Sequence, residues 1–220
     1  MLISLKHNFT LLSCPKCATT SIEQKAKKYC DITLTGTKRG KHTTALLYQK
    51  EWEPFIAKNF GQKPTTIAVI RHPIDHLISW YKYRTRDKLV GRRSLKDISF
   101  DDWMIEKVSG GKGNYRFYTD ENELLIPDVL IPIEIIYKLE TWLATAIGKD
   151  INFGNRNQSP NHPKNKKLSR EYVINNYQHL FSEVTIKNIS LFEYISKINE
   201  NHNNGDIREM SYDKRFLLQS

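Results

Sequence analysis

The stretch that decides the fold runs Ser13-Cys14-Pro15-Lys16-Cys17-Ala18-Thr19-Thr20-Ser21. It follows the apolar run Phe9 to Leu12, which is typical of a buried strand, and it precedes the charged segment Ile22 to Lys28, which favours a helix. Pro15 ends the strand, and the small residues after Cys17 let successive backbone N–H groups converge at the start of the helix. The stretch therefore predicts a strand, a tight polar loop and a helix in succession.

This loop has the features of an anion-binding site. The first N–H groups of a helix have no intrahelical partner, and the helix dipole is positive at that end. The side chains add one positive charge, from Lys16, and three hydroxyl donors, from Thr19, Thr20 and Ser21. We predict that the loop binds a phosphate-like group. An ordinary strand-to-helix turn is the alternative when the loop is considered alone.

The composition limits the class of protein. The chain has 220 residues, enough for one domain with a substantial core, and its net charge is 34 − 24 = +10. This charge favours anionic partners, which include nucleic acid, a sulfated or phosphorylated small molecule and an acidic polymer. The sequence has no apolar stretch of about 18 residues and no signal-peptide pattern. We therefore expect a cytoplasmic protein without a membrane span.

The cysteines do not predict a disulfide framework. Cys14, Cys17 and Cys30 are an odd number in a chain without a secretion signal. Cys14 and Cys17 have the spacing of a redox motif or of half a zinc site. However, no second Cys or His pair lies at metal-ligand spacing, and the intervening Pro15-Lys16 is better explained by anion binding. We therefore predict a functional site without a metal.

A second motif follows a second strand. Residues Thr65 to Ile70 are uncharged and rich in β-branched side chains, as expected of a strand that is covered on both faces. Arg71 follows this strand, and Pro73 is suited to the first turn of the next helix. Because open α/β sheets bind ligands at the carboxyl ends of their strands, we expect Arg71 to face a ligand. Ser79 lies about two helical turns beyond Pro73, within reach of the same phosphate group.

Together the two motifs resemble those of the sulfotransferases that use 3′-phosphoadenosine 5′-phosphosulfate (PAPS). Pro15 to Ser21 resembles the 5′-phosphosulfate loop of that family, and Ile70-Arg71-His72-Pro73 with Ser79 and Tyr81 resembles its 3′-phosphate motif. Weaker similarity to carbohydrate-type and bacterial members extends through residues 133–136, 157–159 and 169–177.

Two positions depart from the pattern of that family. Ala18 replaces a common Gly, which is tolerable if the backbone there needs no positive φ. His76 replaces a common Arg, so a second cationic contact at that point would depend on pH.

The resemblance implies transfer of a sulfuryl group from PAPS to the hydroxyl or amine of a small-molecule or glycan acceptor, anionic acceptors included. Adenosine 3′,5′-bisphosphate is then the product nucleotide, and no metal takes part. Lys16 is expected to contact the bridging oxygen and the 5′-phosphate, and Arg71 and Ser79 to bind the 3′-phosphate. The phosphosulfate would be held by the rest of the loop, namely Pro15, Cys17, Ala18, Thr19, Thr20 and Ser21.

Two residues are proposed as the base that accepts the acceptor's proton. His42 lies between a basic loop and an expected helix start, and it is the first choice. Glu134 is held in reserve.

Two other classes of protein stay open. Gly36 to Thr43 approximates the P-loop of a kinase or nucleotide triphosphatase, but three residues rather than four separate its glycines, and His42 replaces the magnesium-binding Ser or Thr. A basic, non-enzymatic protein that binds nucleic acid would explain the net charge. Neither class explains the two motifs in their order, so we expect no nucleic-acid partner.

The order of the elements predicts an α/β domain. We expect a three-layer sandwich with a mostly parallel central sheet and a P-loop-like phosphosulfate loop. Asp128 to Pro132 is the expected third parallel strand, and the main helices are expected at 22–29, 43–50, 100–108, 134–147, 169–177 and 182–198. The domain is placed at 1–199, with a loosely attached polar tail at 200–220 in which Phe216-Leu217-Leu218 is the segment that could dock. The basic run 82–93 is either a solvated face or a docking site for an anionic acceptor.

Overall fold

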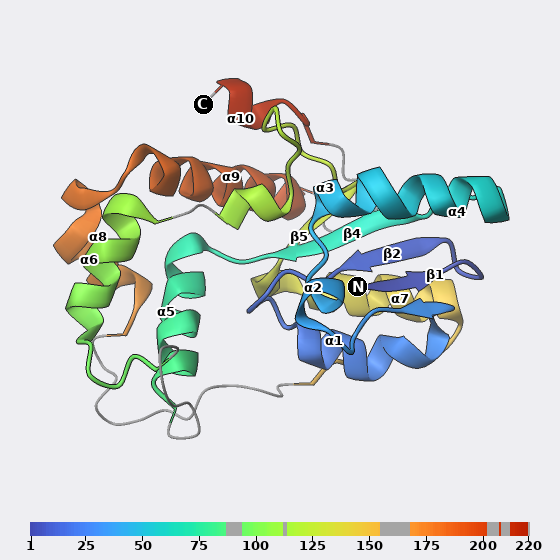
Figure 1. Ribbon diagram of the computed structural model, residues 1–220, viewed down its shortest axis with the longest axis horizontal. Coiled ribbons are helices and arrows are strands. Elements are labelled where there is room, and N and C mark those ends of the chain that lie inside the picture. The colour runs from blue at the N-terminus through green and yellow to red at the C-terminus, as the bar shows by residue number, and fades with distance from the viewer. Residues whose placement is uncertain (87–93, 112–113, 155–167, 202–206, 208–211, 220) are drawn as a thin grey trace.

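The computed structural model describes residues 1–86, 94–111, 114–154, 168–201, 207 and 212–219. Within these ranges one sheet contains five strands in the order β3-β1-β2-β4-β5. The strands are β1 (Leu2–Ser4), β2 (Phe9–Leu12), β3 (Ile32–Thr33), β4 (Thr65–Ile70) and β5 (Val129–Pro132). With helices between the strands, the chain has the α/β fold that its sequence predicts (Figure 1).

The sheet is mixed rather than mostly parallel. β2, β4 and β5 run parallel, with Leu11 opposite Ile67 and Val69 opposite Ile131. β1 pairs antiparallel with β2 on one side and with β3 on the other. The expected parallel arrangement is therefore found in the β2-β4-β5 half only. Sequence reasoning did not find β1, because a strand of three residues is too short to show a periodic pattern.

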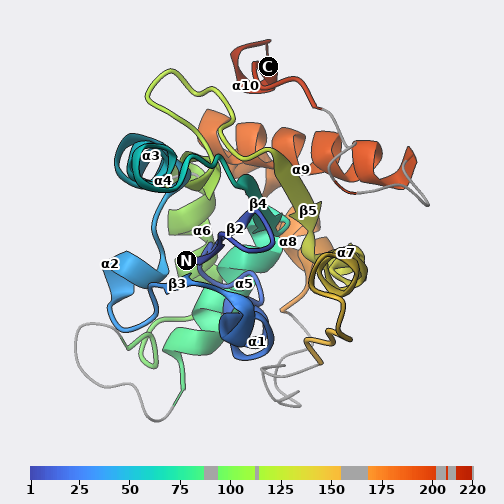
Figure 2. The same cartoon turned by 90° about the vertical axis from the view of Figure 1, so that its right-hand side faces the viewer.

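Helices surround this sheet. They are α1 (Thr19–Ala26), α2 (Lys38–Lys41), α3 (Ala45–Leu47), α4 (Glu53–Phe60), α5 (Pro73–Arg84), α6 (Phe100–Gly110), α7 (Tyr137–Ile147), α8 (Arg170–Tyr177), α9 (Glu183–Asn201) and α10 (Phe216–Gln219). Shorter helical turns are η1 (Lys27–Tyr29), the π-helical η2 (Tyr48–Trp52), η4 (Asn114–Phe117), η5 (Ile133–Ile135) and η7 (Gln178–Leu180). α4 and α9 lie on one side of the sheet, and α1 and α7 lie on the other (Figures 1 and 2).

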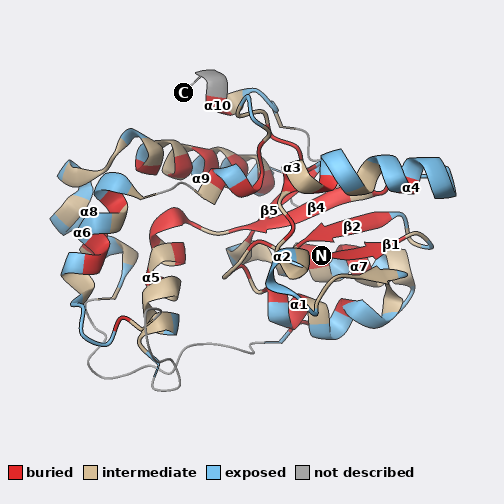
Figure 3. Cartoon of the chain, in the orientation of Figure 1, coloured by how far each residue is buried: buried red, intermediate tan, exposed pale blue. Residues whose placement is uncertain are grey.

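The hydrophobic core lies between the sheet and these helices. The strands are almost entirely buried, and the helices bury the faces that they turn toward the sheet (Figure 3). β4 is the central parallel strand, and its residues Ile67 to Ile70 are at most 4% exposed. This burial explains why β4 reads as an uninterrupted apolar run rather than an alternating one.

Signals for the ends of helices are confirmed at several positions. The Ser99 hydroxyl caps α6 by accepting from the N–H of Asp102 at 3.1 Å, and Ser169 caps α8 in the same way. Gly148 ends α7 with a φ of 70°. Two boundaries differ from expectation. α1 begins at Thr19, inside the predicted loop, and the helix expected at 43–50 continues through η2 to the end of α4.

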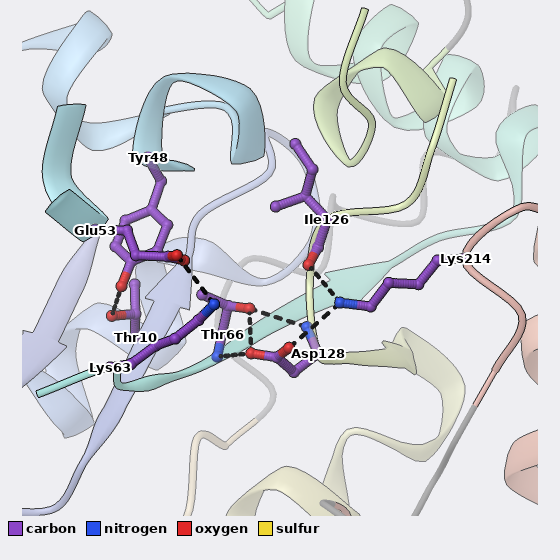
Figure 4. Close-up of polar contacts among 8 residues, drawn as sticks. All are labelled: Thr10, Tyr48, Glu53, Lys63, Thr66, Ile126, Asp128 and Lys214. Carbon is purple, nitrogen blue, oxygen red and sulfur yellow. Dashed lines mark hydrogen bonds and ion pairs between the residues drawn. The ribbon is translucent and has the colours of Figure 1, made fainter. Parts of the chain in front are cut away.

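A polar cluster joins the amino-terminal ends of β4 and β5 (Figure 4). The Asp128 carboxylate accepts hydrogen bonds from the backbone N–H of Thr66 at 2.9 Å and from its hydroxyl at 2.7 Å. In return, the Asp128 N–H donates to the Thr66 carbonyl at 2.9 Å. Lys214 reaches the same carboxylate at 3.4 Å. This cluster fixes the register of the two parallel strands at the edge opposite to their carboxyl ends.

The described part of the carboxyl-terminal segment docks on the domain at the apolar residues that the sequence offers for docking. Leu217 is buried, and the Phe216 ring stacks on Tyr194 with 4.1 Å between centroids. The Lys214 carbonyl accepts a hydrogen bond from the N–H of Leu125 at 2.8 Å. Phe216 and Leu217 thus attach this segment to the domain, although the segment before them is polar.

Two other groups of sequence predictions fall on chain that the structure does not describe. The resemblance at 157–159 and part of the basic run, namely Lys88, Arg92 and Arg93, lie outside the described residues. Among the described residues, no helix combines the length and the apolar character needed to cross a membrane.

Candidate functional site

A cleft of about 1930 Å³ lies at the carboxyl ends of β2 and β4, where α1 and α5 begin. Ligand pockets commonly have volumes of about 300–1,000 Å³, so this cleft has room for a nucleotide and a second molecule together. Every side chain predicted to take part in the site lines the cleft except that of Cys17. The predicted residues that line the cleft are Pro15, Lys16, Ala18, Thr19, Thr20, Ser21, His42, Arg71, Ser79 and Glu134.

The loop between β2 and α1 has a backbone suited to anion binding. Lys16 and Ala18 both have left-handed conformations, with φ of 65° and 54°. Such alternation can turn successive N–H groups toward one side of the chain and form a concave anion-binding nest. Ala18 is also the N-cap residue of α1, so the first-turn N–H groups of that helix adjoin the nest. The condition under which alanine replaces glycine here at no cost, a backbone without positive φ, is therefore not met.

Two side chains from the second motif hold this loop. An Arg71 Nη1 donates to the Lys16 carbonyl at 3.2 Å. The Nε2 of His76, on α5, lies 2.9 Å from the Pro15 carbonyl. Burial lowers the pKa of His76 to about 4, so the ring is neutral at pH 7 and its Nε2–H donates to that carbonyl. His76 thus anchors the loop and supplies no charge at neutral pH.

Lys16 points across the cleft to aromatic side chains of α5. Its Nζ lies 4.4 Å from the centroid of the Tyr83 ring and 5.6 Å from that of Trp80, within the range of a cation–π contact. Burial, followed by the charges of Arg86 and Arg71, lowers the pKa of Lys16 to about 8. An anionic ligand in the cleft would oppose this effect and favour the charged ammonium.

His42 has the geometry of a base. It follows α2, and its Nδ1 lies 2.7 Å from the Ser13 carbonyl, so Nδ1 carries the proton and Nε2 has a free lone pair. Burial is the main cause that lowers the pKa of His42 below its usual value. The ring is therefore neutral at pH 7, as a proton acceptor has to be.

Glu134, the reserve base, is already engaged. Its carboxylate accepts a hydrogen bond from Arg170 at 3.3 Å, and the same guanidinium also pairs with Asp75 of α5. Because this ion pair already occupies the Glu134 carboxylate, His42 remains the first choice for the base.

Cys17 is the predicted site residue whose side chain does not line the cleft. The Cys17 side chain is 1% exposed, and its Sγ lies 4.0 Å from the Tyr118 hydroxyl, beneath the loop. Only the Cys17 backbone can contact a ligand in the cleft. Cys14 is equally buried, and burial raises the pKa of its thiol well above the usual value. That protonated state is opposite to what a reactive redox cysteine requires.

Several cleft residues were not predicted to have a role in the site. Lys38 and Lys41 of α2, Lys107 of α6 and the aromatic residues Trp80 and Tyr83 all line it. The basic run, for which the sequence allows a docking site as one of two alternatives, also contributes Lys82, Arg84 and Arg86. The aromatic residues do lie on one helix in the sequence, but their contact with Lys16 depends on how α5 packs against the loop. That packing leaves no local signal in the sequence.

The segment Gly36 to Thr43 does not form a phosphate loop. Residues 38–41 form α2, and Gly40 lies inside that helix. His42 stands at the position of the magnesium-binding Ser or Thr, and the hydroxyl of the next residue, Thr43, donates to the Gly40 carbonyl at 2.8 Å. The second glycine of the segment, Gly40, therefore lies in a helix, whereas a P-loop has it in the loop before the helix.

Comparison of the chain with protein-family models, with curated proteins and with solved structures found no match. Its function is therefore inferred from the cleft and the motifs that build it.

Proposed function

We propose that the protein transfers a sulfuryl group from PAPS to a hydroxyl or amine of an acceptor molecule. The observation that carries this proposal is the hydrogen bond from Arg71 to the Lys16 carbonyl. It joins the two motifs that resemble the phosphosulfate and 3′-phosphate sites, in one cleft and at one edge of the sheet. A donor with phosphate groups at both its 5′ and 3′ positions requires two such anion sites side by side.

The finer features of the predicted fold support the same proposal. Helices on both sides of the sheet are consistent with a three-layer sandwich, and the left-handed residues of the 15–18 loop are consistent with a P-loop-like phosphosulfate loop. In this arrangement Thr19, Thr20 and Ser21 hold the phosphosulfate. Arg71 and Ser79 bind the 3′-phosphate.

The proposed reaction is a direct displacement at sulfur. The acceptor oxygen or nitrogen attacks the sulfur atom and forms the new bond while the bond from sulfur to the bridging oxygen breaks. The electron pair of that bond stays with the 5′-phosphate of the leaving adenosine 3′,5′-bisphosphate. Lys16 stabilises the charge that develops there, which requires its Nζ to move from the Tyr83 ring toward the nucleotide. The acceptor's proton passes to the Nε2 of His42.

The acceptor faces a cleft with a strong excess of positive charge. Lys38, Lys41, Lys82, Arg84, Arg86 and Lys107 line it in addition to the proposed donor-binding residues. The acidic lining residues are Glu134, which pairs with Arg170, and Glu140, which accepts the N–H of Phe153. We therefore propose a small-molecule or glycan acceptor, with anionic acceptors favoured.

The test of this chemistry is Lys16→Ala. Release of adenosine 3′,5′-bisphosphate from PAPS is measured with a panel of hydroxyl and amine acceptors. Because Lys16 stabilises the leaving oxygen, the variant should lose about 100-fold or more in turnover. Lys25→Ala, which removes an exposed charge of α1, is the matched control and should behave as the wild type. Turnover of Lys16→Ala within a few-fold of the control would contradict this role.

A further inference from the structure

Two cysteines and a histidine meet beneath the loop. Cys14 and Cys17 come from the loop between β2 and α1, and His76 comes from α5. The two sulfur atoms and one ring nitrogen of His76 all lie within 4.8 Å of one another. The three side chains are buried, with exposed fractions of 1%, 1% and 7%. The sequence shows only the pair of cysteines, because His76 reaches them through the packing of α5.

The spacing of these atoms is close to that of a metal site. Zinc binds thiolate sulfur at about 2.3 Å and imidazole nitrogen at about 2.0 Å, which places two sulfur ligands of a tetrahedral site about 3.8 Å apart. The three ligand atoms would therefore need to approach one another by at most about 1 Å. Both cysteines lie in the same short loop, where small backbone rotations bring about such a movement.

The ligand set selects the kind of metal. Two sulfurs and one nitrogen suit zinc and softer ions, whereas calcium and magnesium require oxygen ligands. The charge of the occupied site also favours zinc with two thiolates. Lys16 and Arg71 lie near the cluster and would repel a metal complex with a net positive charge. A zinc ion with two thiolates and a neutral imidazole has a net charge of zero. The Tyr118 hydroxyl lies beside the cluster, 4.0 Å from the Cys17 Sγ, and donates to the Val69 carbonyl at 3.0 Å.

We propose that Cys14, Cys17 and His76 form a structural zinc site that clamps the loop to α5. Zinc binding forms two Zn–S bonds and one Zn–N bond and releases the two thiol protons to solvent, with no change in oxidation state. The zinc ion would fix Cys14 and Cys17. Between them lie Pro15 and Lys16, which line the cleft. The proposal does not depend on the chemistry of the cleft, since a zinc ion beneath the loop would order it for any anionic ligand.

The test is a metal titration of the reduced, full-length chain. Co²⁺ is used as the probe, because cobalt–thiolate bonds give a charge-transfer absorption that reports sulfur ligation directly. The wild type should bind one Co²⁺ per chain with this absorption, and Zn²⁺ should displace it and raise the melting temperature. Cys14→Ser and His76→Gln should each weaken binding by about tenfold or more. His76→Gln also keeps a side-chain N–H donor for the Pro15 carbonyl.

Cys30→Ser is the matched control. Its thiol is half-buried, donates to the Ala26 carbonyl at 3.4 Å and lies outside the cluster, so the variant should bind Co²⁺ as the wild type does. Wild-type chain that shows no thiolate absorption with Co²⁺ would overturn the proposal, and this result needs no variant to fold. The proposal would equally be overturned if Cys14→Ser kept the full absorption, or if Cys30→Ser lost it. Because no nucleotide is present, failure here leaves the proposed function standing.

Discussion

Ala18 has a left-handed backbone conformation at the start of α1, with φ of 54°. For a residue with a Cβ atom this conformation costs about 1–2 kcal/mol, and glycine avoids the cost. From the sequence, alanine is tolerable at this position only if the backbone needs no positive φ. The conformation depends on how the loop joins β2 to α1, and no local pattern encodes it.

Ala18→Gly should therefore stabilise the protein. We expect the free energy of unfolding, measured by chemical denaturation, to rise by about 1 kcal/mol. Ala57→Gly provides a control of opposite sign, because Ala57 is exposed in the interior of α4, where glycine should cost about 1 kcal/mol. A loss of stability in Ala18→Gly comparable to that of the control would contradict the observed loop geometry.

His72 gives the fold a dependence on pH. Its Nδ1 accepts the N–H of Ile74 at 3.3 Å and caps α5, so this nitrogen must be unprotonated. Burial, with a contribution from Arg170, lowers the pKa of His72 to about 4, compared with about 6.5 in an unfolded chain. Between these values the unfolded state binds the proton and the folded state does not. Stability therefore falls as the pH is lowered from about 6.5 to about 4.

His72→Asn should remove this part of the pH dependence, because asparagine keeps a capping oxygen and does not titrate. We expect the wild type to lose up to about 3 kcal/mol more than the variant over that pH range. The comparison with the variant is needed because His76 is also buried and contributes its own dependence. Parallel curves of unfolding free energy against pH would show that His72 is not responsible.

At the scale of elements, the strands and helices with clear local signals could be predicted from the sequence. β4 and β5, the caps at Ser99 and Ser169, and the end of α7 at Gly148 are all confirmed. Strand direction could not be predicted in full, because β1 is short and its antiparallel pairing depends on a hairpin. A local sequence pattern can predict a strand, but it does not predict which other strand pairs with it or in which direction.

Besides the backbone pairing of β4 with β5, the side chain of Asp128 joins the amino-terminal ends of the two strands. Asp128 accepts two hydrogen bonds from Thr66, which is 3% exposed, so removal of the carboxylate leaves a buried backbone N–H without this partner. Asp128→Ala should lower the free energy of unfolding by about 2 kcal/mol. The exposed Asp150 provides the control, since Asp150→Ala should change stability by less than about 0.5 kcal/mol. Equal effects of the two substitutions, measured by chemical denaturation, would remove Asp128 from this role.

At the scale of the whole molecule, the site depends on the meeting of distant segments. The two motifs and His42 could be predicted from the sequence, and the fold brings all three to one cleft. The contact of Lys16 with Tyr83 and the grouping of Cys14 and Cys17 with His76 could not be predicted. Both depend on the angle at which α5 leaves the end of β4, and this angle is a property of the packed molecule.

Many basic residues of the chain line the cleft. A net charge of +10 alone is compatible with nucleic acid, polymers and small anions. Among these partners, the cleft favours a small anion. Its cations surround a concave space of about 1930 Å³ rather than a flat face. Under the proposed function, a nucleotide with two separate phosphate positions would occupy this space, with the 15–21 loop and Arg71 side by side in its wall.

The most direct test of the central claim is the calorimetric binding of adenosine 3′,5′-bisphosphate, compared with 5′-AMP and with magnesium-ATP. Charge-assisted bonds to the 3′-phosphate should make the bisphosphate bind about tenfold or more tighter than 5′-AMP. Arg71→Ala should abolish this difference, whereas Arg39→Ala, which removes an exposed charge outside the cleft, should preserve it. Equal affinity for the bisphosphate and 5′-AMP, or a preference for magnesium-ATP, would contradict the proposed donor site.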